Sequence, residues 1–168
     1  MLETKNIKSY YISNYKKKYK EQVVDLIFSI WNKEHKFSVS YESKPDLFNI
    51  EDFYSGLKGN FWIAVTNDDK VIGSIAIENL NSGNCALKRM FVRKDFRGKG
   101  VAQTLFNQAL EWAKSLDVKN VYLSTNQEKS ATAIRFYKKN NFQEIDEKQA
   151  PPNFPTFKDD DVFMNLNL

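Results

Sequence analysis

The feature that most constrains the fold is a strand, a glycine-bearing loop and a long helix that follow one another directly. Residues 85–92 (CALKRMFV) are rich in apolar and β-forming residues, which predicts a strand. Residues 93–100 are polar and contain two glycines, and residues 101–116 place apolar side chains at helical spacing. A further strand is expected at residues 121–126. The two strands must then be parallel neighbours joined by a right-handed crossover.

Patterns on either side of this unit predict the rest of the fold. Runs of β-formers between turn residues predict strands, and apolar residues three or four apart predict helices. The expected strands are residues 7–12, 60–66, 71–78, 142–145 and 162–168, and the expected helices are residues 16–34, 45–57 and 131–140. This order predicts an α/β chain with a mixed (α+β) sheet and helices on both of its faces.

Composition limits the function. The 168 residues suit one domain spanning residues 1–168, with 42% hydrophobic residues to fill its core. One Cys and one His exclude an internal disulfide and make a zinc site of these residues untenable, so no metal is expected. The net charge of +4 would attract an anionic ligand but is small for a nucleic-acid binder. With no apolar run near the roughly 18 residues of a membrane span, we expect a cytoplasmic protein without membrane or nucleic-acid partners.

The glycine loop has the properties of a phosphate site. The first N–H groups of a helix lack internal partners and carry partial positive charge. Gly98 and Gly100 allow close approach to that backbone, and Arg97 and Lys99 add full charges. A nucleoside triphosphatase is disfavoured because the pattern G-x-x-x-x-G-K-[ST] is absent. The dinucleotide fingerprint fails because Gln103 stands at its third glycine.

The hexapeptide RGKGVA, residues 97–102, resembles the R/Q-x-x-G-x-G/A signature of the GCN5-related N-acetyltransferases (GNAT). Residues 87–142 are similar to the core of that family. The similarity includes the sequence AIRFY, residues 133–137 of an expected helix, and the following Asn141 and Phe142. The resemblance implies a mostly antiparallel sheet with one parallel pair of strands that splay apart. It also implies acetyl-coenzyme A as co-substrate.

The resemblance further assigns roles to individual residues. It implies that the pantetheine arm of the coenzyme pairs with the backbone of Phe91 and Val92 and contacts Asn126. Tyr137 matches the tyrosine that protonates the leaving thiolate, a task that suits a phenol with a reference pKa near 10. The pyrophosphate would lie on the backbone amides of Arg97, Gly98, Lys99, Gly100, Val101 and Ala102.

Three positions depart from the family's usual pattern. Ala86 stands where many relatives carry a general base, and residues 85–92 contain no carboxylate. Glu78, at the end of the neighbouring strand, is the substitute we expect, although a solvated strand end explains it as well. Ser130 replaces an Asn and could cap the following helix. Asn141 replaces a glycine and suits a left-handed helix end.

These observations predict an acetyl-coenzyme A-dependent N-acetyltransferase that acts by direct attack of a primary amine. An alternative is a non-catalytic acyl-coenzyme A sensor or interaction module, which the missing strand carboxylate favours. A nucleic-acid-binding protein is a third reading, favoured only by the isoelectric point near 9.0. The acceptor is expected to be a small-molecule amine or a peptide amine. Homodimers are common in the family, and the sequence allows one.

Overall fold

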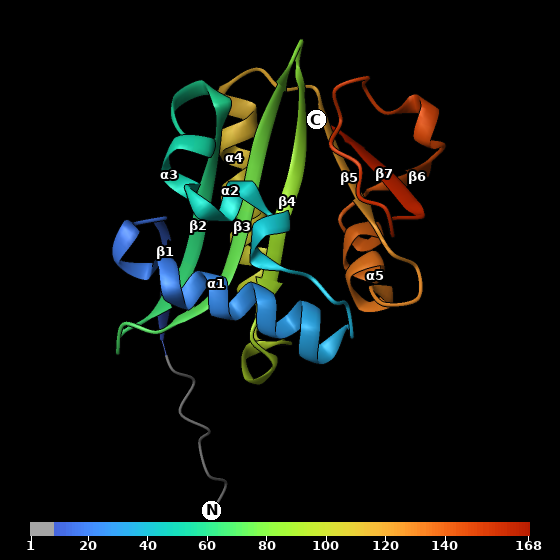
Figure 1. Cartoon of the computed structure of the whole chain (residues 1–168). Helices are drawn as coiled ribbons and strands as arrows, with labels where there is room; N and C mark the ends of the chain where they lie inside the picture. Colours follow the sequence, from blue (N-terminus) through green and yellow to red (C-terminus); the bar gives the residue numbers. More distant parts are fainter. Residues whose placement is uncertain (1–8) are drawn as a thin grey trace, which may run out of the picture.

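The computed structural model describes residues 9–168 as a seven-stranded sheet with helices around it (Figure 1). The strands are β1 (Tyr10–Asn14), β2 (Gly59–Thr66), β3 (Val71–Asn81), β4 (Asn84–Val92), β5 (Asn120–Thr125), β6 (Gln143–Ile145) and β7 (Val162–Asn167). Their order is β1-β2-β3-β4-β5-β7-β6. Neighbours are antiparallel except β4 and β5, which are parallel. The predicted mixed sheet with one parallel pair is confirmed.

Helices cover both faces of the sheet. They are α1 (Lys20–Ser29), α2 (Pro45–Phe48), α3 (Ile50–Phe53), α4 (Val101–Ser115) and α5 (Ala131–Lys139). Figure 1 shows α1, α2 and α3 in front of β2, β3 and β4, with α4 behind them. We call these the front and rear faces. No helix among residues 9–168 is long and apolar enough to cross a membrane.

Each face has its own hydrophobic core. On the front face, Val23, Leu26 and Ile27 of α1 are fully buried with Ile63 and Val65 of β2. On the rear face, apolar residues of α4 and α5 join one cluster with residues of β2, β3, β4, β5 and β7. Burying a Val, Leu or Ile side chain contributes about 1.5–3 kcal/mol. The two cores therefore hold the sheet from opposite sides.

The parallel pair β4 and β5 is joined only at one end. Its partners run from Asn84 opposite Asn120 to Ala86 opposite Tyr122. Beyond Ala86 and Tyr122 the two strands separate, as the ribbons in Figure 1 show. The remainder of β4, from Leu87 onward, stays paired with β3 on its other side. This is the splayed pair that the sequence led us to expect.

A bulge interrupts β4 beyond the point of separation. Arg89 and Met90 lie opposite the single residue Ile75 of β3, so β4 carries one extra residue here. Arg89 has a φ of 54°, a left-handed conformation that is costly for a residue with a side chain. Bulges of this kind redirect side chains next to active sites. The strand predicted at residues 85–92 is confirmed as β4, and the bulge within it was not predicted.

The first expected helix, residues 16–34, is helical from Lys17 to Glu34 but is not an α-helix throughout. A 3₁₀ turn precedes α1, and a π-helical turn, Ile30–Glu34, follows it. The N–H of His35 donates to the C=O of Ile30 at 2.9 Å, which is the long spacing of a π turn. The first expected strand begins later than predicted, at Tyr10, while residues 7 and 8 lie outside the described residues.

The second expected helix, residues 45–57, was wrong. Asn49 leaves the helical conformation (φ −139°, ψ 72°) and separates α2 from α3. Its side chain accepts a hydrogen bond from the N–H of Asp52 and so caps α3. Asn competes with the helical backbone for hydrogen bonds, which favours caps over helix interiors.

Candidate active site

The glycine turn before α4 is open to a ligand. Gly98 and Gly100 have φ values of 71° and 83°, and a Cβ added to either would meet no atom within 4 Å. The N–H of Thr104 donates to the C=O of Gly100 at 3.0 Å, which starts the helical hydrogen bonds. The N–H groups before Thr104 are thus outside the helix ladder. Donors, partial positive charge and free space together fit a pyrophosphate such as that of coenzyme A.

The two cationic side chains of this turn are held by the protein itself. The guanidinium of Arg97 donates to both oxygens of Glu34 at 2.7 and 3.0 Å, and its Nε donates to the C=O of Val92 at 2.8 Å. The ammonium of Lys99 donates to the C=O of Asp95 at 2.6 Å. Arg97 therefore joins the π-helical turn after α1 to the glycine turn. Glu34 offsets part of the charge of Arg97. The backbone amides of the turn would therefore contribute more to phosphate binding, and the Arg97 side chain less, than expected.

The splayed edge of β4 leads from the glycine turn to the bulge. Phe91 and Val92, the two residues expected to pair with pantetheine, lie in this part of β4, beyond its pairing with β5. The ring of Phe91 packs edge-on against Trp31 at 5.4 Å between centroids. An extended amide chain can pair with such an edge as an added strand would.

Asn126, the residue after β5, is used within the chain. Its Nδ2 donates to the C=O of Asp159 at 2.7 Å, and its Oδ1 accepts from the N–H of Lys129 at 3.0 Å. It fixes the turn that leads into α5. Ser130 occupies the N-cap position of α5, but its side chain makes no capping hydrogen bond, so that expectation was wrong. Asn141 adopts the expected left-handed conformation, with a φ of 69°.

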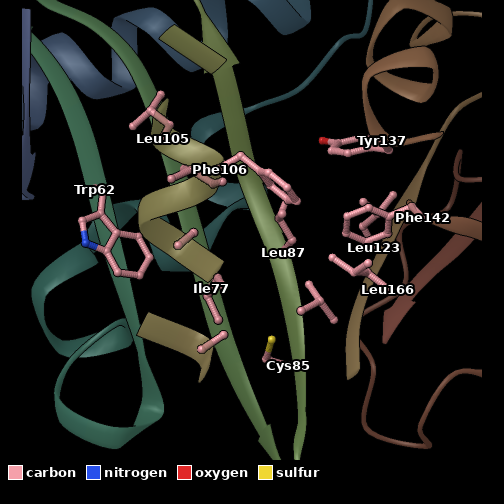
Figure 2. Packing of buried hydrophobic residues seen from close by; sticks show 14 of the residues in the cluster. Trp62, Ile77, Cys85, Leu87, Leu105, Phe106, Leu123, Tyr137, Phe142 and Leu166 are labelled. Atoms are coloured by element: carbon pink, nitrogen blue, oxygen red, sulfur yellow. The ribbon is translucent and has the colours of Figure 1, made fainter. Parts of the chain in front are cut away.

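Tyr137 lies on α5 in the rear core, beside the splay. Its ring contacts those of Phe136 and Phe142 at centroid distances of 5.8 and 5.5 Å. Figure 2 shows its hydroxyl oxygen pointing from α5 toward β4. Burial raises the pKa of this phenol, so Tyr137 keeps its proton at neutral pH. A neutral phenol that faces the splay can donate a proton to a group bound there.

Glu78 on β3 is ion-paired rather than solvated. It lies opposite Ala86, and its Oε2 accepts from the ammonium of Lys88 at 3.0 Å. The Lys88 side chain is 9% exposed and that of Glu78 is 26% exposed. Glu78 also lines an open surface hollow of about 870 Å³ between α3 and the end of β3. The carboxylate is thus accessible from this hollow but shares its charge with Lys88.

The sequence analysis missed a buried ion pair at the bulge. The Nε and Nη2 of Arg89 donate to the two carboxylate oxygens of Asp46 at 2.8 and 2.7 Å, and Tyr54 donates its hydroxyl to the same carboxylate at 2.6 Å. Ser74 donates its hydroxyl to the C=O of Arg89 at 2.7 Å. These contacts hold the unusual backbone of Arg89. The sequence feature that could have predicted this ion pair is Arg89, a charged residue in the largely apolar sequence of β4.

The sequence profile of the acetyltransferase (GNAT) family matches residues 24–142. The chain belongs to this family. The matched region runs from α1 through the glycine turn, β4, β5 and α5, so it contains the splay and both of its sides. The resemblance inferred from the hexapeptide is therefore confirmed.

Relatives that have been characterised match over part of their length. N-acetylaspartate synthetase of Xenopus tropicalis is 33% identical over 104 residues, which cover 61% of this chain and 38% of that protein. Streptothricin acetyltransferase A of Bacillus subtilis is 29% identical over 109 residues, which cover 65% of this chain and 62% of that protein. The chain thus aligns with less than two thirds of either relative.

Solved GNAT structures match over almost their whole length. A GNAT-family acetyltransferase from Staphylococcus aureus Mu50 is 32% identical, with a TM-score of 0.91 over 95% of this chain and 99% of that one. An acetyltransferase from Streptococcus agalactiae is 29% identical with a TM-score of 0.88 over 95% and 98%. The PaiA N-acetyltransferase of Thermoplasma acidophilum, solved with coenzyme A, shares the fold at 20% identity and a TM-score of 0.75, over 95% of this chain and 99% of that one.

Proposed function

We propose that this chain transfers the acetyl group of acetyl-coenzyme A to a primary amine. The open glycine turn beside the unpaired edge of β4 is the observation that carries the proposal. The turn offers amide donors for a pyrophosphate, and the edge offers backbone groups for an amide-bearing arm. Gly98, Gly100, Val101 and Ala102 would hold the phosphates, and Phe91 and Val92 would hold the arm.

In the proposed reaction, acetyl-coenzyme A supplies a thioester whose carbonyl carbon bonds to the amine nitrogen as its carbon–sulfur bond breaks. A backbone N–H at the β4 bulge is the proposed donor to the transient oxyanion. Tyr137 gives its phenolic proton to the departing sulfur. Glu78 accepts the proton that the amine loses, directly or through water. The products are an N-acetyl amine and a free thiol, and no covalent enzyme intermediate is required.

The acceptor is a small amine in this proposal. The names of the two characterised relatives point to different acceptors, an amino acid for N-acetylaspartate synthetase and an antibiotic for streptothricin acetyltransferase A. The family alone therefore leaves the acceptor class open. A cytoplasmic location and a homodimer are the accompanying proposals. Size measurement by light scattering, with and without acetyl-coenzyme A, tests the homodimer.

Two measurements test the function. Acetyl-coenzyme A at about 100 times its Kd should add roughly 2.7 kcal/mol to the stability of the fold, and the thermal midpoint should rise accordingly. An amine panel should then release free thiol in a manner that depends on the acceptor. A midpoint that does not move with millimolar acetyl-coenzyme A contradicts the proposal.

A binding module without turnover is the second candidate. The ion pair between Glu78 and Lys88 favours it, because the Lys88 ammonium occupies a carboxylate oxygen that would otherwise be open to the amine. Such a module would be stabilised by acetyl-coenzyme A and would release no thiol with any amine. The same two measurements therefore separate the candidates.

A further inference from the structure

Two cations and two aromatic rings meet on the front face of the splay. The Lys44 ammonium lies 4.4 Å from the ring centroid of Phe157 and 5.4 Å from that of Trp31. The Arg89 guanidinium lies 5.0 Å from Trp31 and 5.7 Å from Phe157. We call these four residues the cationic cluster. Its members come from the π turn after α1, the residue before α2, the bulge of β4 and the segment before β7.

The charges of this cluster are unequally balanced. Arg89 is neutralised by the carboxylate of Asp46 at hydrogen-bond distance. Among residues 9–168, Lys44 forms no ion pair with a carboxylate. Burial and the nearby charge of Arg89 both lower the pKa of Lys44. A half-buried cation beside a second cation would be stabilised by an anion that approaches from solution.

A carboxylate lies near this cluster, on the segment before β7 that also carries Phe157: the N–H of Asp160 donates to the C=O of Phe157 at 3.1 Å. Asp160 precedes β7, and its carboxylate accepts a hydrogen bond from the hydroxyl of Ser124 on β5. Burial raises the pKa of Asp160, while the charge of Lys44 acts in the opposite direction. The two groups influence each other's pKa without forming a direct ion pair. Lys44 and Asp160 thus carry opposite charges near the same residue, Phe157, without contacting each other directly.

These charged groups lie on the side of the splay from which an acceptor amine would approach the thioester. Arg89 and Ser124 both lie beyond Ala86 and Tyr122, where β4 and β5 separate. Trp31 of the cluster packs against the front core and Arg89 is bound to Asp46 of α2, whereas Tyr137 belongs to the rear core. A thioester in the splay would have the proton donor on its rear side and the charged groups on its front side. The nucleophile must then approach past Lys44 and Asp160.

We propose that Lys44 binds a carboxylate of the acceptor while Asp160 faces its amino group, so that the acceptor is an α-amino acid or an equally small zwitterion. This inference rests on the proposed function. Lys44 and Asp160 act as binding residues, and neither takes part in bond making. An acceptor with both charges satisfies both groups, whereas an amine without a carboxylate leaves Lys44 unpaired.

Matched acceptors provide the test. L-leucine is compared with 3-methylbutylamine, and L-phenylalanine with phenethylamine, by thiol release at saturating acetyl-coenzyme A. Each amine lacks only the carboxylate. The proteins are the wild type, Lys44→Met and the control Lys33→Met, which removes an exposed lysine of the nearby π turn. The thermal shift with acetyl-coenzyme A is recorded for each, so that a folding defect is recognised.

The wild type should show a kcat/KM about 10- to 100-fold higher for each amino acid than for its amine, the range of a charged hydrogen bond. Lys44→Met should remove this preference by slowing the amino acids alone, and Lys33→Met should keep it. Equal rates for both acceptor classes in the wild type, or a preference that survives Lys44→Met, would overturn the inference and leave the proposed function intact. Thiol release with none of these four acceptors but with another amine of the panel would also overturn the inference, whereas a normal thermal shift without thiol release for any amine would overturn the proposed function itself.

Discussion

The Arg89 guanidinium and the Asp46 carboxylate form a two-point ion pair in which the side chains are only 5% and 4% exposed. It ties the bulge of β4 to the short helix α2 on the front face. Breaking a buried pair by removing one partner costs about 3–5 kcal/mol, because the other charge is left uncompensated. The pair therefore secures the shape of the site more than it adds net stability.

Asp46→Asn should lower the free energy of unfolding by about 3–5 kcal/mol, measured by urea denaturation. The double variant Asp46→Leu with Arg89→Met should recover most of this loss, because it leaves no charge buried. A double variant as unstable as the single one would show that the pair matters through packing rather than through charge.

The ion pair between Arg89 and Asp46 also predicts how the stability of the fold depends on pH. Burial alone would raise the pKa of Asp46, but the hydrogen bond and charge of Arg89 outweigh it and leave that pKa below its usual value. Since the folded-state pKa is the lower one, this stabilisation is complete above about pH 4, the value for an unfolded Asp, and is lost as pH falls through the folded pKa. Wild type should thus lose stability below about pH 4 more steeply than the double variant, as urea titrations at several pH values would record.

Gly100→Glu should abolish coenzyme A binding in a folded protein. The new side chain would enter the open space over the turn and place a negative charge beside the phosphates. The left-handed φ adds strain of about 1–2 kcal/mol. Gly56→Glu is a matched control, since Gly56 also has a positive φ and open space but lies away from the turn. Near wild-type affinity of Gly100→Glu in a calorimetric titration would place the phosphate site elsewhere.

Tyr137→Phe should slow turnover by about 100- to 10,000-fold, the usual contribution of a general acid, while acetyl-coenzyme A binds almost as before. The ring and its packing remain, and the hydroxyl is needed only when charge develops on sulfur. Because burial raises the pKa of Tyr137, its ionisation should not cause a falling limb of kcat below about pH 10. Steady-state kinetics beside a coenzyme titration check both points. Equal turnover in the two proteins would remove Tyr137 from the mechanism.

Glu78→Gln should lower kcat/KM by about 100-fold or more, because an amide cannot accept the proton of the amine. Asp52→Asn is the control, because Asp52 lines the same hollow without the pairing to Lys88. The kcat/KM values of the three proteins are compared with one acceptor, beside a coenzyme titration of each. A Glu78→Gln variant that keeps the wild-type rate would leave Glu78 as the partner of Lys88 only.

Much of the fold could be predicted because local patterns determine it. The glycine turn, the apolar stripe of α4 and the alternation in β7 all reflect local rules of backbone conformation and burial. The positions of Tyr137 and of the glycine-turn residues were predicted from short sequence motifs. The separation of β4 and β5 was predicted from the family resemblance, because a family has a known strand order that the sequence of one strand does not reveal.

The rest depended on contacts between residues distant in sequence. Asn49 breaks a helix whose apolar spacing looked continuous. The left-handed conformation of Arg89 is maintained by Asp46 and Ser74, which are 43 and 15 residues away. Arg97 was expected to serve a phosphate, yet its partner Glu34 could be found only in three dimensions. Such pairings have no local signature, because their partners are brought together only by the folding of distant segments.

The short parallel contact between β4 and β5 has a consequence for how the molecule opens. Among residues 9–168, the strand pairing that joins β5, and through it β6 and β7, to the remaining strands is confined to Asn84–Ala86 of β4. Segments joined by few hydrogen bonds exchange their amide protons through separate local openings. We expect β7 to exchange faster than β2 and β3. Acetyl-coenzyme A, by bridging the two groups of strands, should slow that exchange and make the two units open as one.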